Sequence, residues 1–264
     1  MNNLLQVILL GVIEGVTEFL PISSTGHLLI AEKLGLGQRS EFFNIIIQAG
    51  AILAVTVIYW QRLWGLLTRL GEPDNRAYAL KLTLAFLITA VLGLIVTKLG
   101  FELPENVTPV AWALILGGFW MLAAEWTAAR KPVTTEITWP VAIVVGLAQI
   151  VAGVFPGTSR SGATIFAAML SGTSDRKAAT EFAFLVGIPT MYAASGYALL
   201  KQLKLGFSGE SYGDLAIAFV VSTVTAFVVV KWLMRYIQTH RFTVFAYYRI
   251  APGVALLLLR PSGS

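Results

Sequence analysis

The feature that most constrains this sequence is a series of apolar stretches that recur along its whole length. Each can cross the roughly 30 Å hydrocarbon core of a bilayer as an α-helix. Full crossings are predicted at about 42–60, 77–97, 109–126, 181–200, 214–234 and 243–259. A closed β-barrel needs short segments of alternating polarity, which these runs lack. The pattern predicts an all-α polytopic membrane protein.

The charge content supports this prediction. Only 12% of the 264 residues are charged, whereas soluble domains carry about 25%. We expect one integral membrane domain over residues 1–264. A cleavable signal peptide is not expected, because the first basic residue is Lys33. Disulfides, thiolate catalysis and cysteine metal sites are excluded because the chain has no cysteine.

Two further apolar stretches are interrupted in the middle. Residues 4–20 and 139–155 each end at a proline and a polar turn, and short apolar runs resume at His27 and Ala163. Neither half is long enough to span a bilayer alone. Each pair is predicted to form a re-entrant hairpin whose tip lies at membrane depth, where protein or a wet cavity must surround the polar turn.

The two interrupted regions resemble each other. GVIEGVTEFLPISS at 11–24 aligns with GLAQIVAGVFPGTS at 146–159, which pairs Ser24 with Ser159. This similarity predicts an internal repeat.

Each repeat would hold one hairpin and three crossings, with repeat 1 at about 1–130 and repeat 2 at about 137–260. Three crossings are an odd number, so the second copy is inverted. Six transmembrane helices then surround two re-entrant hairpins that enter from opposite faces and meet near the midplane.

Basic residues indicate the orientation. Eleven lie in or beside the loops on one side of the predicted topology, against six on the other, including Arg260. The richer loops are 61–76, 127–138, 171–180 and 235–242. The positive-inside rule predicts that they are cytoplasmic and that both termini lie outside. The net charge of +5 is attributed to these loops, and nucleic-acid binding is not expected because no basic run has interleaved aromatics.

Glu14 and Glu18 are four residues apart, so they share one face of a helix. Glu14 would lie roughly 16 Å into the membrane. Two buried carboxylates repel each other and require a cation, an arginine or a shared proton. The pair is therefore predicted to hold a metal ion, the alternative being a purely structural pairing with a basic side chain.

The turn Ser23–His27 leads into a short helix, whose first amides and positive dipole end favour an anion. Ordinary N-capping by a hydroxyl is a compatible alternative. Beside the two glutamates, His27 is a candidate base or nucleophile.

The segment PGTSRSGAT at 156–164 supplies the opposite charge. Arg160 is predicted at membrane depth among hydroxyls and glycine amides, a set suited to phosphate oxygens. Alternatively, Arg160 only neutralises Glu14 or Glu18.

Together these groups fit metal-assisted phosphoryl transfer, which needs a cation holder, a nucleophile and a charge clamp. No P-loop, GxGxxG or HExxH motif occurs. A lipid phosphatase that uses two histidines is set aside, because the second histidine, His240, is predicted at the cytoplasmic edge.

EGVTEFLPISSTGH and PGTSRSGAT closely resemble the two signature motifs of the undecaprenyl-diphosphate phosphatase family of bacterial inner membranes, which confers bacitracin resistance. QAGAILAV at 48–55 is also similar. The resemblance implies removal of one phosphate from undecaprenyl diphosphate, the carrier lipid of cell-wall synthesis, with Mg²⁺ or Ca²⁺ as cofactor. It also implies a re-entrant, inverted-repeat fold with an outward-facing site.

The family's functional residues fall on Glu14, Glu18, Ser24, His27 and Arg160. In the resulting hypothesis the glutamates hold the cation, Ser24 attacks, and His27, together with Glu18, takes its proton. His27 or an activated water stays an alternative nucleophile. Further substrate-binding candidates are Ser23, Thr25, Gly157, Thr158, Ser159, Ser161, Thr164 and Gln48.

A second hypothesis comes from the inverted repeat, which is typical of secondary transporters. The chain would then carry the polyprenyl phosphate lipid across the bilayer without hydrolysing it. In either case a polyprenyl lipid and the bilayer are the expected partners. The oligomeric state is left open, a homodimer being one alternative.

Overall fold

The protein is described by a computed structural model that covers residues 2–99, 107–205 and 211–258. Over these residues it is helical and contains no strand, which confirms the all-α prediction there. The elements are α1 Asn3–Thr17, α2 Ser24–Ala31, a π-helical turn η1 Glu32–Leu36, α3 Glu41–Ile58, α4 Trp60–Thr68, α5 Pro73–Lys98, α6 Val107–Ala128, α7 Trp139–Val154, α8 Arg160–Ser171, α9 Arg176–Leu205, α10 Tyr212–Thr239 and α11 Thr243–Leu258.

Five of the described helices are long and apolar enough to cross a membrane. They are α3, α5, α6, α9 (through Gln202) and α10. These five correspond to predicted crossings, so the chain is a multi-pass membrane protein. The sixth predicted crossing falls on α11, which is apolar but has 16 residues. Residue 259, its predicted end, lies outside the described residues, as does Arg260.

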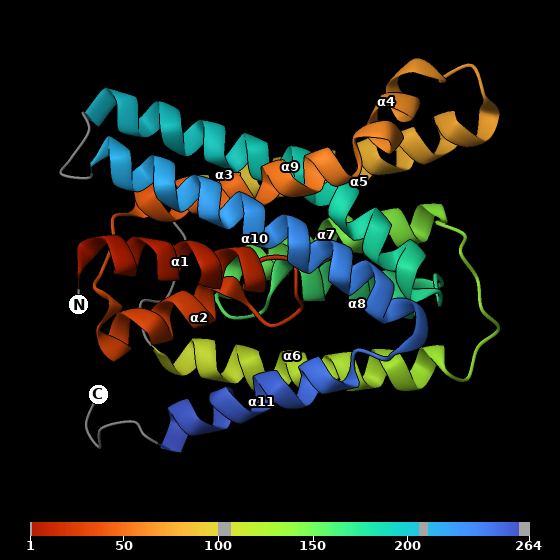
Figure 1. Cartoon of the computed structure of the whole chain (residues 1–264). Helices are drawn as coiled ribbons and strands as arrows, with labels where there is room; N and C mark the ends of the chain where they lie inside the picture. Colours follow the sequence, from red (N-terminus) through yellow and green to blue (C-terminus); the bar gives the residue numbers. More distant parts are fainter. Residues whose placement is uncertain (1, 100–106, 206–210, 259–264) are drawn as a thin grey trace.

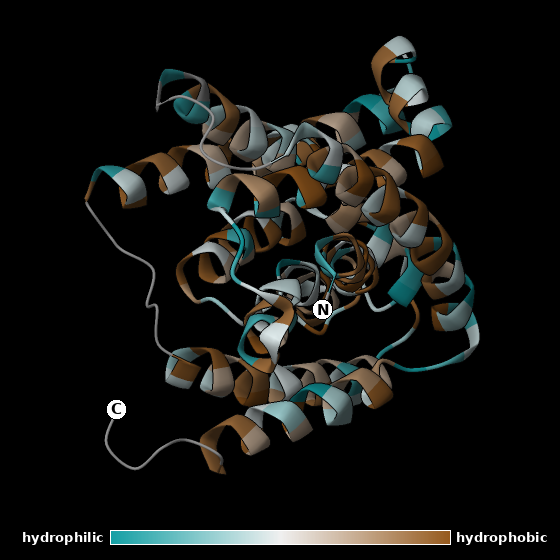
Figure 2. Ribbon diagram, turned by 60° about the vertical axis from the view of Figure 1, so that its left-hand side comes forward, coloured by the Kyte–Doolittle hydropathy of each residue, from teal (hydrophilic) through white to brown (hydrophobic). Residues whose placement is uncertain are grey.

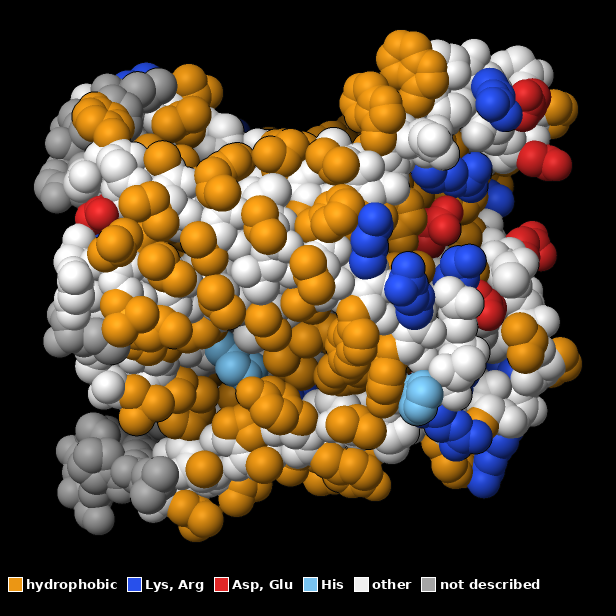
Figure 3. Space-filling view, viewed as in Figure 1, with side chains coloured by type: hydrophobic (Ala, Val, Ile, Leu, Met, Phe, Trp, Pro, Cys, Tyr) orange, Lys and Arg blue, Asp and Glu red, His pale blue; other side chains and the backbone are white. Residues whose placement is uncertain are grey.

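Hydrophobic side chains cover much of the face of the bundle that Figure 3 shows, and hydrophobic residues are frequent along the helices in Figure 2. Leu80, Leu87, Val91 and Leu94 of α5 are all exposed. A helix that is apolar on its outward face as well as its inward face is typical of lipid contact. Charged side chains instead gather at one end of the molecule, where α4 lies (Figure 3).

The predicted loop 61–76 contains a helix, α4, so treating it as a loop was wrong. The helix is amphipathic. Its apolar residues Trp60, Trp64 and Leu67 are exposed, and Leu66 is buried. A short helix of this kind, carrying two tryptophans beside the apolar belt, is typical of a membrane interface.

Both interrupted regions form pairs of short helices joined by a turn. In Figure 1 the α1–α2 pair occupies the end of the bundle near the N-terminus, and the α7–α8 pair comes from the opposite end. Close contacts with long helices fix the positions of α1 and α7. A Cβ atom at Gly15 of α1 would lie 2.7 Å from the carbonyl oxygen of Ser222 in α10, and one at Gly146 of α7 would lie 2.8 Å from that of Ala85 in α5. Small residues let each inner helix approach a long helix closely.

Candidate active site

The two polar turns have the same local structure. Ser23 and Ser159 both have positive φ, at 74° and 70°. Each caps the following helix by accepting a hydrogen bond on Oγ, from the amide of Gly26 at 3.3 Å and of Gly162 at 3.2 Å. N-capping therefore occurs in both turns. The shared cap pairs Ser159 with Ser23 rather than with Ser24, the partner that the alignment predicted. The second turn has two residues between its proline and its capping serine, whereas the first turn has one.

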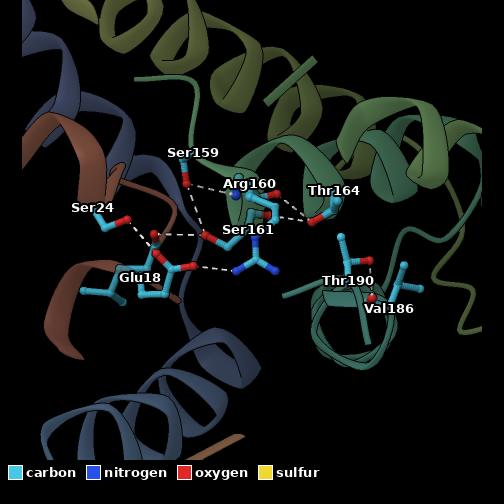
Figure 4. A network of polar contacts seen from close by, with 10 residues as sticks. Glu18, Ser24, Ser159, Arg160, Ser161, Thr164, Val186 and Thr190 are labelled. Carbon is cyan, nitrogen blue, oxygen red and sulfur yellow. Dashed lines mark hydrogen bonds and ion pairs between the residues drawn. The ribbon is translucent and has the colours of Figure 1, made fainter. Parts of the chain in front are cut away.

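The tips of the two hairpins meet at Glu18, the residue that ends α1 (Figure 4). Arg160 Nη2 donates to Glu18 Oε1 at 2.5 Å, and Ser24 Oγ donates to Glu18 Oε2 at 2.5 Å. A third contact joins the turns, since Ser161 Oγ donates to the Leu20 carbonyl oxygen at 3.1 Å. The structure thus brings a carboxylate, a hydroxyl and a guanidinium into one cluster, and the Glu18–Arg160 ion pair is formed.

Arg160 occupies a narrow slot against α9. A Cβ atom at Gly187 would lie 2.6 Å from Arg160 Nη1, a separation that real Cβ atoms do not show. The Arg160 side chain is mostly buried and that of Glu18 almost entirely so. Because both partners are shielded from water, their attraction is screened far less than that of a surface pair.

Glu14 lies one turn before Glu18 and is 2% exposed. Its carboxyl group is within hydrogen-bonding reach of Glu18, and its Oε2 atom has no hydrogen-bond partner in the part of the chain that the structure describes. No group of three or more His, Asp or Glu side chains forms a complete metal site among those residues. Two carboxylates fit a hard divalent cation that takes its remaining ligands from phosphate and water.

His27 hydrogen-bonds to two groups, and neither of them is Ser24. Its Nδ1 lies 2.7 Å from the carbonyl oxygen of Ser23, and its Nε2 lies 2.8 Å from the hydroxyl of Tyr248. A carbonyl oxygen only accepts, so Nδ1 carries the proton; in the neutral ring Nε2 then accepts from Tyr248. The partner of the Ser24 hydroxyl is the Glu18 carboxylate instead.

The remaining predicted residues divide into two groups. Thr158 and Ser159 are buried in the second turn, and Ser161 is buried in the first turn of α8. Thr164 Oγ1 donates to the Arg160 carbonyl oxygen at 2.8 Å. Thr25 is exposed in the first turn of α2, and Gln48 is half-buried on α3. Neither of these two belongs to the hydrogen-bond network around Glu18.

Comparison with known proteins identifies the family. Residues 7–255 match the family model described as bacitracin resistance protein BacA. The chain belongs to the BacA family. A relative from Rhizobium etli (strain CIAT 652), named undecaprenyl-diphosphatase, is 69% identical over 256 residues, which cover 97% of this chain and 96% of the relative. Another of the same name, from Xanthomonas oryzae pv. oryzae (strain PXO99A), is 63% identical over 265 residues and covers all of both chains.

Two residues of this BacA-family site come from α11 and were missed by sequence reasoning. Tyr248 contacts His27, and Arg249 contacts both turns. A usable signal existed for Arg249, because an arginine in the middle of a predicted span marks a functional position. Tyr248 had no such signal, since tyrosine is ordinary in an apolar helix.

Proposed function

We propose that this chain hydrolyses undecaprenyl diphosphate to undecaprenyl phosphate and inorganic phosphate, and so recycles the cell-wall carrier lipid and confers bacitracin resistance. The near-complete coverage of relatives named undecaprenyl-diphosphatase supports this function. The observation that carries it is the Ser24 hydroxyl held on one oxygen of Glu18, with Arg160 on the other. A nucleophile, a proton acceptor and a phosphate-binding cation are the parts that phosphoryl transfer requires.

In the proposed first half-reaction, Ser24 Oγ bonds to the terminal phosphorus as the P–O bond to the lipid phosphate breaks. The serine proton moves to Glu18, which already accepts it in a hydrogen bond. Arg160 binds the oxygens of the transferred group, using donors that its single contact with Glu18 leaves available. Undecaprenyl phosphate leaves as an anion and needs no proton.

In the second half-reaction a water oxygen displaces Ser24 from phosphorus. Glu18 returns its proton to Ser24 Oγ, which restores the enzyme. One proton of the water stays on the released phosphate, and the other passes to His27 Nε2 and then to solvent. Tyr248, the present partner of Nε2, is half-exposed, so the proton has a path to solvent.

We also propose that Glu14 and Glu18 hold a divalent cation, Mg²⁺ or Ca²⁺. When bound, it would stabilise negative charge on the phosphate oxygens as a Lewis acid. The unpartnered Oε2 of buried Glu14 supports this assignment, because a buried carboxylate oxygen without a donor is costly.

Changing Glu14 to glutamine keeps the side-chain volume and removes a charged ligand. We expect the metal concentration for half-maximal activity to rise about 10–100-fold. Binding of Mn²⁺, followed by electron paramagnetic resonance, should weaken in parallel. As a control, Gln149→Leu alters a buried position in α7 that hydrogen-bonds Thr89 and should leave the metal dependence unchanged. Unchanged metal dependence in Glu14→Gln would remove Glu14 from the cation site.

Changing Gly187 to alanine tests the slot around Arg160. The added methyl group must push the guanidinium away, because it would lie 2.6 Å from Nη1. A displacement of about 1 Å costs roughly 10²-fold in rate, so we expect kcat to fall by that order. Gly196→Ala on the same helix is the matched control, since a Cβ there meets open space. If Gly187→Ala and Gly196→Ala were equally active, the close fit of Arg160 against Gly187 would not be needed for catalysis.

For the topology we propose the inverted repeat, with six crossings, both termini outside the bacterial inner membrane, and a site that opens to the periplasm. The matching caps at Ser23 and Ser159 support the repeat. The clustering of basic side chains at the end of the bundle near α4 supports a cytoplasmic assignment for that end (Figure 3).

The function is tested by purifying the chain in detergent and measuring phosphate release from undecaprenyl diphosphate. A hydrolase releases phosphate without any gradient. A carrier of the lipid, the alternative that an inverted repeat suggests, would bind the lipid and release none. That second outcome would overturn the proposed reaction.

A further inference from the structure

Arg249, in the middle of α11, is 1% exposed and contacts both polar turns at once. Its Nη1 donates to the Pro21 carbonyl oxygen at 3.2 Å. Its Nη2 lies 2.9 Å from the carbonyl oxygens of Gly157 and Thr158. One guanidinium therefore joins the turn that precedes Ser24 to the turn that precedes Arg160.

The same guanidinium is held on its other side by α6. Its Nε donates to the carbonyl oxygen of Leu114 at 3.0 Å, and its Nη2 donates to that of Ala113 at 3.0 Å. Space for it exists because α6 has a glycine there: a Cβ atom at Gly117 would lie 2.6 Å from Arg249 Cζ. The planar group is thus fixed in position, and its partners are five backbone oxygens.

Arg249 has no salt bridge to any of the residues described. A buried charge is costly, and an apolar side chain joins helices at a lower free-energy cost. A side chain that only joined helices would therefore not need to be an arginine at this position.

The bonded carbonyls also lie close to the two strained serines. Pro21 is two residues before Ser23, and Thr158 directly precedes Ser159, the two non-glycine residues with positive φ in the part of the chain that the structure describes. Such a conformation is retained only where surrounding contacts impose it. We propose that Arg249 is a positioning residue: it holds the two turns in register so that Ser24 and Arg160 face the same phosphate. This inference rests on the proposed phosphatase function.

The test uses Arg249→Lys and Arg249→Met in the full-length protein in detergent, with undecaprenyl diphosphate as substrate. Lysine keeps the charge but cannot reach the carbonyls of both turns and α6 with a planar fork. We expect kcat per folded molecule to fall about 10²-fold in both variants, with KM little changed, because misplaced reacting groups slow the chemical step. The folded fraction and the melting temperature are measured in the same samples.

Arg176→Lys is the matched control. Arg176 forms a partly buried ion pair with Glu125, with Nη2–Oε2 at 2.6 Å, and it contacts neither turn. Its replacement should lower the melting temperature without changing kcat per folded molecule. If Arg249→Lys behaves in the same way, Arg249 is only structural and the inference is wrong.

Gly117→Ala provides a second route if the arginine variants do not fold. The methyl group displaces the guanidinium from the α6 side, and we expect the same selective fall in kcat. Wild-type kcat in this variant would overturn the inference. An inactive wild-type protein would instead overturn the proposed function, so the two failures are distinguishable.

Discussion

Replacing Arg160 by lysine is expected to lower kcat/KM for undecaprenyl diphosphate by about 10³-fold or more. An arginine that stabilises a transferring phosphoryl group contributes roughly 10³–10⁵-fold to kcat. In this site the guanidinium must contact Glu18 and the phosphate together, which a planar fork with five donors allows. A lysine ammonium is a single point charge, so it would stay with Glu18 and lose the phosphate. The measurement is steady-state phosphate release by the purified variant.

Arg62→Lys is the matched control for this prediction. Arg62, in α4, also pairs with a glutamate, Glu181, with Nε–Oε1 at 3.4 Å, but its side chain is 42% exposed. Exposed pairs contribute about 0–1 kcal/mol, so little change in kcat/KM is expected. If Arg160→Lys retained activity within tenfold of the wild type, Arg160 would not be the phosphate clamp.

Replacing Ser24 by alanine is expected to reduce kcat about 10⁴–10⁶-fold. Removal of a catalytic nucleophile has effects of this order. Ser24 is the only hydroxyl bonded to Glu18 in the described structure, at 2.5 Å, so the attacking group and its proton acceptor are already in contact. Alanine removes the oxygen and leaves the cap of α2 intact, because Ser23 supplies that bond.

Trapping the intermediate separates the possible nucleophiles. With substrate labelled in its terminal phosphate, rapid acid quenching should give acid-stable label on the wild-type protein and none on Ser24→Ala. Acid-labile label would assign attack to His27, and an unlabelled active enzyme would assign it to water. Thr127→Ala, which removes a hydroxyl from a half-buried position on α6, should label as the wild type does.

The interrupted hairpins were predictable because their signals are local. A proline and a polar turn cannot continue a helix, and short apolar runs on either side cannot span a bilayer. Residue order alone therefore predicted a turn at about 21–26 and another at 156–162, and the structure places the turns slightly earlier, at 18–23 and 155–159. The helix α4 was missed because its residues fall between two predicted crossings and were assigned to the loop 61–76, although their apolar residues share one face.

Partner choice within the site was less predictable. Sequence reasoning assigned the Ser24 proton to His27 together with Glu18, and the structure places Glu18 alone against Ser24. A histidine close in sequence is a natural candidate base, but its Nδ1 is directed to the carbonyl oxygen of Ser23 by the first turn of α2. The orientation of the short helix α2 about its axis decides which group His27 contacts, and residue spacing alone does not specify that orientation.

By itself, the sequence determined that this chain is an apolar helical membrane protein, which of its helices break, and which polar residues stand at the breaks. Polarity and backbone preference act over a few residues, so such features can be read from residue order. Only the tertiary structure decided that Glu18 rather than Glu14 pairs with Arg160, 142 positions away, and that Arg249 joins Pro21 to the second turn across 228 positions. These contacts depend on how closely helices approach at glycines such as Gly15 and Gly117, because that spacing sets which polar groups can touch.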